Sequence, residues 1–200
     1  MVWLNKEDKI IGVFTLFATV IFVIILARAV LYSSSGEIKL SGATRKNPIT
    51  DALLVPVQLT IPKIQIEAKI LEVGITKLGN MATSGNFTDV GWYKYGVMPG
   101  EQGSAVLAGH VDNGLSLAGV FFHLNNLEIG DDIFITTKGG KKLHFTVKKI
   151  ETYNFDEQNT NVFTEDSGRL LKLITCTGTW IPQNKIYSKR LVVTAELVKI

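Results

Sequence analysis

The 200-residue sequence predicts a mostly β protein: a closed barrel of seven to eight strands with short helices, preceded by one N-terminal transmembrane helix. Three observations support this prediction. Residues 10–27 form a continuous uncharged and mostly apolar run. Segments rich in β-branched and apolar residues, several of them alternating in polarity, then recur along residues 52–200. Clusters of Gly, Pro, Asn and Asp separate these segments, as turns separate strands.

The apolar run at 10–27 has the length of a membrane span. With the next four residues it covers roughly the 30 Å thickness of a bilayer core. A signal peptide has a shorter apolar region, about 7–15 residues, and the small-x-small pattern at 27–29 is a poor cleavage site beside bulky Val30 and Leu31. A buried core helix would need a polar face, which this run lacks. The run therefore predicts an uncleaved transmembrane anchor at 10–31.

Basic residues indicate how this anchor is oriented. Lys6 and Lys9 precede the apolar run, and only Arg28 follows it closely. Because the more basic flank stays in the cytoplasm, we predict a short cytoplasmic segment at 1–9 and an extracytoplasmic remainder. The predicted location is thus the plasma membrane, crossed once.

Beyond the anchor, composition divides the chain into a tether and one domain. Residues 32–51 are rich in Ser, Gly, Thr and Lys without a hydrophobic period, and they predict a flexible tether. Residues 52–200 have the length of one ordinary domain. Its expected strands are 57–62, 64–75, 103–110, 131–136, 141–153, 169–176 and 189–200.

The connections complete the expected barrel. Gly139-Gly140 predicts a tight hairpin turn, and short helices are expected at 87–93 and 117–127. The last two strands are expected to be antiparallel neighbours joined by a loop at 177–187. Closure of the sheet would leave no unpaired edge.

Composition also excludes several kinds of function. The net charge of +3 carries no basic stripe, so nucleic acid is not an expected partner. A single cysteine forms no intramolecular disulfide, and no Cys/His cluster has the spacing of zinc ligands. No metal or cofactor is expected, although calcium dependence stays open.

The one cysteine, Cys176, is expected where a strand gives way to a loop, and strand parity indicates which way it points. In the last strand Leu191, Val193, Ala195 and Leu197 form the apolar face, which leaves Arg190 on the other face. In the preceding strand Leu171 and Leu173 are core candidates, which leaves Lys172 and Cys176 outward. Cys176 and Arg190 should therefore point the same way from one rim.

A nucleophilic thiol needs a base, because the thiolate is the attacking species. His144 lies inside an alternating strand and His123 on an expected surface helix. His110 follows Gly109 at a strand end, as Cys176 does, and is the best candidate partner.

The stretches AVLAGHVDN, LITCTGTW and YSKRLVVTAELV, in that order, resemble the sortases, which are membrane-anchored cysteine transpeptidases of bacterial surfaces. The likeness extends over most of 57–200, and AGHVD with TCTG is most similar to class F. One departure stands out, since Lys172 occupies the first Thr of the family's T-L-x-T-C signature. The resemblance implies a sortase-like β-barrel.

The resemblance also implies roles. Cys176 would cleave a Leu-Pro-x-Thr-Gly-like sorting signal between Thr and Gly through a thioacyl enzyme, with His110 as acid and base and Arg190 stabilising the oxyanion. Thr175 and Trp180 would contact substrate, but an inward strand Thr and an aromatic that only packs its loop fit the sequence equally well. Asp112 could orient His110, although a turn Asp is the preferred interpretation.

The implied partners are surface proteins with a C-terminal sorting signal and an amine acceptor of the cell envelope, and the catalytic domain is expected to be monomeric.

Two alternative functions stay open. One is a non-enzymatic anchored extracellular β-barrel that serves as a binding or scaffold module, with Cys176 buried far from His110 and Arg190. The other is a peptidoglycan cross-linking thiol transpeptidase, although LITCTG lacks the His and Gly that flank the cysteine in such enzymes. Within the sortases, Asn47-Pro48 without an Asp-Pro-aromatic plug favours anchoring of single proteins over pilus polymerisation.

Overall fold

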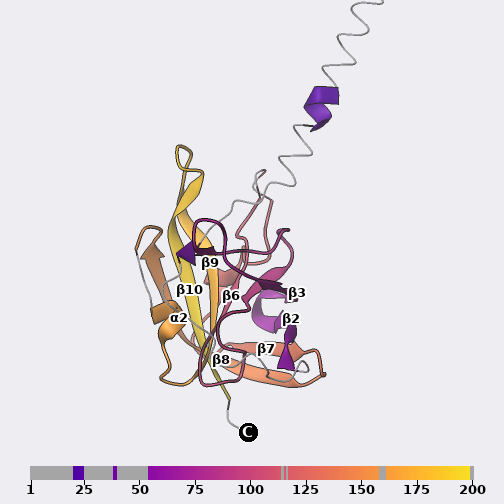
Figure 1. Ribbon diagram of the computed structural model, residues 1–200, viewed down its shortest axis with the longest axis vertical. Coiled ribbons are helices and arrows are strands. Elements are labelled where there is room, and N and C mark those ends of the chain that lie inside the picture. The colour runs from indigo at the N-terminus through magenta and orange to yellow at the C-terminus, as the bar shows by residue number, and fades with distance from the viewer. Residues whose placement is uncertain are drawn as a thin grey trace, which may run out of the picture.

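The computed structural model describes residues 20–24, 38–39, 54–113, 115, 117–157 and 161–198. Strands dominate it (Figure 1): β1 Ile38–Lys39, β2 Pro56–Ile61, β3 Ile66–Val73, β4 Asn80–Met81, β5 Val90–Tyr93, β6 Gly103–Ala108, β7 Asp132–Thr137, β8 Lys142–Asn154, β9 Arg169–Ile181 and β10 Ile186–Leu197. The helical segments in the domain are short, namely the 3-10 turns η2 Pro62–Ile64 and η3 Leu124–Asn126 and the helix α2 Asn161–Thr164.

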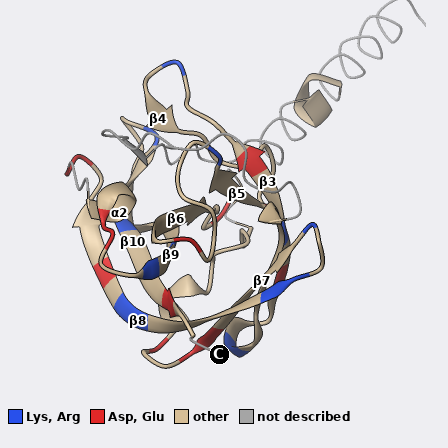
Figure 2. Cartoon of the chain, turned by 60° about the horizontal axis from the view of Figure 1, so that its bottom comes forward, with Lys and Arg blue, Asp and Glu red and all other residues tan. Residues whose placement is uncertain are grey.

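Eight strands close into a barrel in the order β10-β8-β7-β2-β3-β5-β6-β9, with β9 pairing back onto β10. The prediction of a closed barrel of seven to eight strands is confirmed. Two neighbouring pairs are parallel, β3 with β5 and β6 with β9, and the others are antiparallel. Figure 2 shows the strands forming a ring, with charged residues of both signs distributed around it.

The barrel interior is built from alternate residues of its strands, as the alternating pattern predicts. Leu171 and Leu173 of β9 and Leu191, Val193 and Ala195 of β10 all belong to this core. Each fully buried Leu or Val side chain contributes about 1.5–3 kcal/mol relative to exposure. This parity is confirmed, and it leaves Cys176 and Arg190 on the opposite face.

That opposite face is covered rather than open to solvent. Val162 and Phe163 of α2 pack there against Val106 of β6, Ile174 of β9 and Val192 of β10, forming a second apolar cluster. The alternation in β9 and β10 cannot reveal this cover, because α2 lies outside those strands in the chain.

Lys172 lies beneath the same cover. It is on the outer face, as predicted, yet only 3% of its surface is exposed. Its Nζ donates to the Asn161 carbonyl at 2.9 Å and to Glu165 Oε2 at 2.5 Å. Because a buried ammonium requires partners, these two contacts hold α2 and the residue that follows it against the barrel.

The helix predicted at 87–93 is wrong. Asn86 Oδ1 accepts hydrogen bonds from the backbone N–H groups of Thr88 and Asp89, which fixes a turn there. The chain then enters β5, which is buried along its whole length between β3 and β6. The side-chain hydrogen bonds of Asn86 and the pairing of β5 in the sheet therefore outweigh a weak helical pattern.

The helix predicted at 117–127 is also largely wrong, since only η3 is helical. The backbone N–H of Gly119 donates to the Val111 carbonyl, and that of Phe121 donates to the His110 carbonyl. A Cβ on Gly119 would lie 2.4 Å from the His110 carbonyl oxygen, so this close approach needs glycine. The segment therefore packs as an irregular strip along the loop that carries His110.

The predicted loop at 177–187 is instead a hairpin. β9 continues to Ile181 and β10 starts at Ile186, so Cys176 lies within a strand. Gly178 has φ +83°, and the register between the strands shifts near it, between Tyr187 and Lys189. A β-bulge accommodates a residue in the left-handed conformation without ending the strand pairing. The hairpin projects beyond the barrel (Figure 1).

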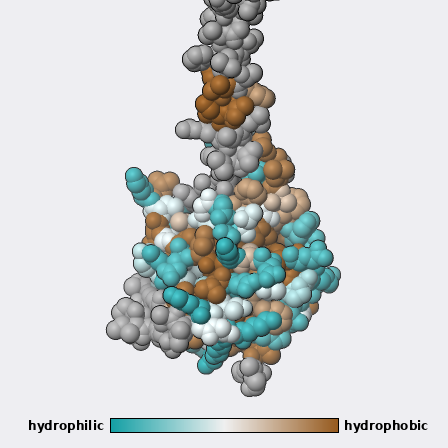
Figure 3. Space-filling view, turned by 90° about the vertical axis from the view of Figure 1, so that its right-hand side faces the viewer, coloured by the Kyte–Doolittle hydropathy of each residue, from teal (hydrophilic) through white to brown (hydrophobic). Residues whose placement is uncertain are grey.

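The predicted cytoplasmic segment 1–9 lies outside the described residues, as do most of the anchor 10–31 and the tether 32–51. Residues 20–24 are helical, and their exposed hydrophobic side chains are visible in Figure 3. Ile38–Lys39, inside the expected tether, pairs with β4. Among the helices of the described residues, none is both long and apolar enough to span a membrane.

Candidate functional site

Three neighbouring strands bring the candidate residues together. Arg190 and Cys176 are direct partners across β10 and β9. In the parallel pairing of β6 with β9, Ala108 is the partner of Ile174. His110 lies two residues after Ala108, and Cys176 lies two residues after Ile174. The strand register therefore aligns His110, Cys176 and Arg190 at one level of the barrel.

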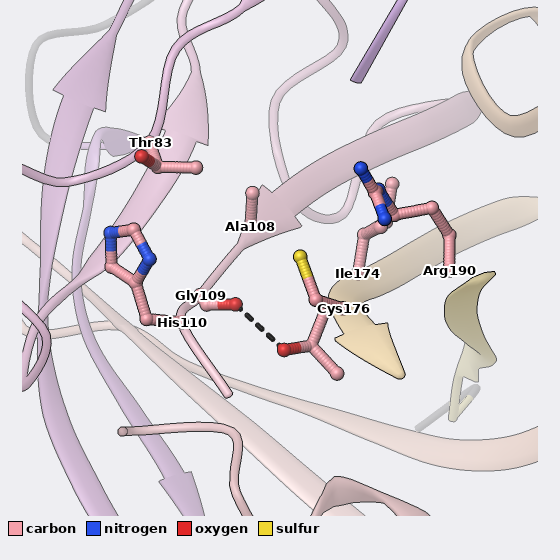
Figure 4. Close-up of a pocket in the computed structure, with 8 residues that line it drawn as sticks. Thr83, Ala108, Gly109, His110, Ile174, Cys176 and Arg190 are labelled. Atoms are coloured by element: carbon pink, nitrogen blue, oxygen red, sulfur yellow. Dashed lines mark hydrogen bonds between the residues drawn. The ribbon is translucent and has the colours of Figure 1, made fainter. Parts of the chain in front are cut away.

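A small cavity of about 10 Å³ joins these residues, lined by Thr83, Ala108, Gly109, His110, Ile174, Thr175, Cys176 and Arg190. In Figure 4 the Cys176 sulfur lies between the His110 imidazole and the Arg190 guanidinium. The structure thus brings His110, Cys176 and Arg190 to one site. The scaffold alternative requires the cysteine to lie far from both, and the structure does not match that requirement.

Arg190 is buried and directed by its own strand. Its Nη1 donates to the carbonyls of Tyr187 at 3.0 Å and Lys189 at 2.9 Å. Its Nε and Nη2 are buried and have no hydrogen-bond partner among the described residues. Buried donors without partners are costly, so Nε and Nη2 of this fixed cation are available to an acceptor that enters the cavity, which Arg190 lines.

Cys176 is a buried thiol, 6% exposed. Burial raises its pKa above the ordinary value, the positive charge of Arg190 opposes that shift, and the negative charge of Asp112 adds to it. The thiol is therefore protonated at neutral pH, and a base must remove its proton before attack.

His110 is the base within reach of that pocket, 3% exposed, with Nε2 3.2 Å from the Ser84 carbonyl oxygen. Thr175 Oγ1 donates to the Gly109 carbonyl at 2.8 Å, a bond drawn in Figure 4. This hydrogen bond ties the strand of the cysteine to the residue that precedes the histidine. The other two histidines lie elsewhere, since His123 is exposed beside η3 and His144 pairs with Asp132 on β7.

A larger groove, about 270 Å³, opens at Cys176. Its lining is Val111, Asp112, Phe121, Phe122, Asn125, Thr175, Cys176, Thr177, Gly178, Tyr187 and Leu191. The Tyr187 hydroxyl donates to Asp112 Oδ2 across this groove. Asp112 is therefore part of the site through Tyr187, a pairing of residues 75 positions apart that no local sequence pattern predicts.

Trp180 lies on the projecting hairpin, 38% exposed, outside the lining of both hollows. Its ring packs on that of Tyr187, with centroids 5.2 Å apart.

The sequence did not predict three aromatic residues of the site, Tyr187, Phe121 and Phe122. Nothing in their local sequence pattern distinguishes an aromatic residue that lines a groove from one in the core. Among the described residues, no group of three or more His, Cys, Asp or Glu side chains is placed to hold a metal ion.

Comparison with known proteins identifies the family of this domain. The family model for the Sortase domain matches residues 59–198. Sortase C-1 from Actinomyces oris shares 28% identity at a TM-score of 0.56, covering 72% of this chain and 73% of that one. No curated protein matches the chain.

Two further solved structures agree in fold. Sortase A from Corynebacterium diphtheriae has 23% identity and a TM-score of 0.57, covering 73% of this chain. Sortase D5 from Clostridium perfringens has 23% identity and a TM-score of 0.54, with 72% of this chain and 79% of that one covered. The match spans 61% of the length of the C. diphtheriae protein.

Proposed function

Because the chain belongs to the sortase family, we propose that it is a cysteine transpeptidase in which Cys176 is the nucleophile, His110 the general acid and base, and Arg190 the oxyanion-stabilising residue. The observation that carries this proposal is the single level of the barrel that His110, Cys176 and Arg190 share, where two buried Arg190 nitrogens, Nε and Nη2, have no hydrogen-bond partner among the described residues.

The reaction begins with a neutral thiol, since burial keeps the pKa of Cys176 high. His110 takes the thiol proton as the sulfur attacks the carbonyl carbon between Thr and Gly of a Leu-Pro-x-Thr-Gly-like signal. Arg190 Nε and Nη2 donate to the oxygen on which negative charge develops. His110 then protonates the departing amine, which leaves a thioester on Cys176.

An amino nucleophile of the cell envelope completes the transfer by attacking that thioester. Thr175 supports the geometry by holding the Gly109 carbonyl, which fixes the backbone directly before His110. Trp180 supports the groove indirectly, since it packs on Tyr187. Thr175 thus positions the backbone beside the catalytic base, and Trp180 supports the wall of the larger groove.

The remaining parts of the proposal rest on sequence. The anchor at 10–31 and tether at 32–51 would hold a monomeric domain of residues 52–200 outside a bacterial plasma membrane, and a class F assignment rests on AGHVD and TCTG. The clients would be single surface proteins with a C-terminal sorting signal.

The test uses the full chain with a fluorogenic Leu-Pro-x-Thr-Gly peptide and an excess of a glycine amide acceptor. Wild type should yield both the cleaved peptide and the new amide. Cys176→Ala should abolish both products, and His110→Ala should nearly do so. Retained cleavage in Cys176→Ala would exclude the thioacyl route.

A further inference from the structure

Cys176 lines two hollows whose charged side chains have opposite signs. The smaller cavity contains Arg190, and the larger groove contains Asp112. Among the lining residues that the structure describes, Asp112 is the one charged group in the larger groove. A cationic ligand is therefore favoured there, whereas a developing oxyanion is favoured in the cavity.

The Asp112 carboxylate is fixed in place. The residue is 8% exposed, and its backbone forms an isolated bridge with Ala118. One carboxylate oxygen, Oδ2, accepts the hydrogen bond of the Tyr187 hydroxyl, whose pKa is raised by burial and by Asp112 itself. Tyr187 thus stays a neutral donor, and a carboxylate has room for further donors.

Asp112 and Cys176 line the same groove, and the negative charge of Asp112 contributes to the raised pKa of Cys176. A cation bound at Asp112 would therefore lie in the groove into which a thioester on Cys176 opens. The rest of the wall suits a short organic amine, with Phe121 and Phe122 for its apolar atoms and the Asn125 side chain for an amide.

We propose that this groove is the acceptor site, in which Asp112 recognises the primary ammonium group of the incoming nucleophile. The inference rests on the proposed function, since it places the second substrate of that reaction. It also separates the two substrates, because the sorting signal's carbonyl oxygen faces Arg190 while the acceptor approaches from the Asp112 side.

The acceptor nitrogen loses two protons in the transfer. The bound ammonium releases one proton to solvent and becomes a free amine. Its nitrogen attacks the thioester carbon, the C–N bond forms and the C–S bond breaks. His110 takes the second proton from that nitrogen and passes it to the departing Cys176 sulfur, which restores the neutral thiol.

The experiment compares two nucleophiles on the same thioacyl enzyme, using the full chain. Glycinamide is largely an ammonium ion at neutral pH, whereas hydroxylamine is largely neutral. The measured quantity is the ratio of transfer product to hydrolysis product, in wild type and in Asp112→Asn. Asp132→Asn, which removes a half-exposed carboxylate on β7, is the matched control.

With glycinamide the ratio should fall about tenfold in Asp112→Asn, the effect of losing a charge-assisted hydrogen bond. With hydroxylamine it should stay within about twofold, and the control should match wild type. In wild type, added salt should lower the glycinamide ratio and leave the hydroxylamine ratio constant, a measurement that does not depend on the folding of a variant.

The acceptor site would be overturned if Asp112→Asn lowered the ratio equally with both nucleophiles. It would also be overturned if the glycinamide ratio changed with neither the substitution nor salt. In either case the groove would belong to the sorting signal. Absence of any thioacyl adduct in wild type would overturn the proposed function itself and this inference with it. An adduct with unchanged ratios would overturn the inference alone.

Discussion

Cys176 and Arg190 stand directly opposite each other on β9 and β10, so the thiol and the guanidinium extend from the same face of the sheet. Backbone pairing sets this relationship rather than side-chain flexibility. The carbonyls of Tyr187 and Lys189 then orient the guanidinium through Nη1. A cation held in this way acts through direction as well as charge.

Arg190→Lys tests that direction. Lysine keeps the charge but replaces a planar set of donors by one compact ammonium. We expect kcat for peptide cleavage to fall by an amount equivalent to about 2.7–4 kcal/mol, the cost of one oxyanion donor, in both Arg190→Lys and Arg190→Ala. Steady-state kinetics under excess acceptor measure the loss. Near-wild-type turnover by the lysine variant would show that charge alone suffices.

The reactivity of Cys176 should depend on pH in a definite direction. Because burial raises the pKa of the thiol, its alkylation by iodoacetamide should reach half its maximum rate above about pH 8.5, the value of a free cysteine. Asp112→Asn removes a charge that raises this pKa and should move the midpoint down. Arg190→Gln removes a charge that lowers it and should move the midpoint up. A midpoint below that of free cysteine would contradict this assignment.

Thr175→Val removes the donor to the Gly109 carbonyl while keeping the shape of the side chain. A buried acceptor that loses its donor costs roughly 1–3 kcal/mol, so the free energy of unfolding should fall by that amount, with a parallel loss of kcat. Thr175→Ser keeps the hydroxyl and is the matched control. If valine lowers stability without affecting kcat, Thr175 does not position His110.

The Lys172–Glu165 pair should behave asymmetrically. Glu165→Ala leaves the buried ammonium with only the Asn161 carbonyl, whereas Lys172→Met removes the charge and fills the space. Since the Glu165 side chain is 41% exposed, we expect Glu165→Ala to cost about 1–3 kcal/mol, less than for a fully buried pair, and Lys172→Met to cost less than that. Chemical denaturation measures both, and the reverse order would refute this role for Lys172.

The same pair has a predictable pH dependence. The hydrogen bond from Lys172 is the main cause that lowers the pKa of Glu165. A lowered pKa in the folded state means that the stabilisation is complete above the unfolded value, about pH 4.3, and is lost as pH falls through the folded value. Wild type should therefore lose more stability than Glu165→Ala in that acidic window.

Much of the site could be predicted because it depends on parity and order along the chain. Alternation in β9 and β10 placed Leu173 and Val193 inside, so Cys176 and Arg190 had to share the other face. The position of His110 just after β6, which ends at Ala108, was also predicted from the Gly that precedes it. The parallel pairing of β6 with β9, however, has no local signal, and that pairing aligns His110 with Cys176.

The errors arose where contacts distant in sequence override local patterns. The sequence pattern at 117–127 favours a helix, but its backbone forms hydrogen bonds with the backbone at 110–111. Gly178 allows a bulge where the end of a strand was expected. The cover of α2 over Lys172 and the bond from Tyr187 to Asp112 depend on tertiary packing alone. Such contacts become visible only when the barrel is closed.

The measurement that tests the central claim most directly is the intact mass of the full chain after mixing with a Leu-Pro-x-Thr-Gly peptide and no added amine. We expect a transient adduct with the mass of the peptide's acyl portion through Thr, mapped to Cys176 by digestion and absent in Cys176→Ala. Cleavage of the peptide without any adduct on Cys176, or an adduct that survives in Cys176→Ala, would contradict the account.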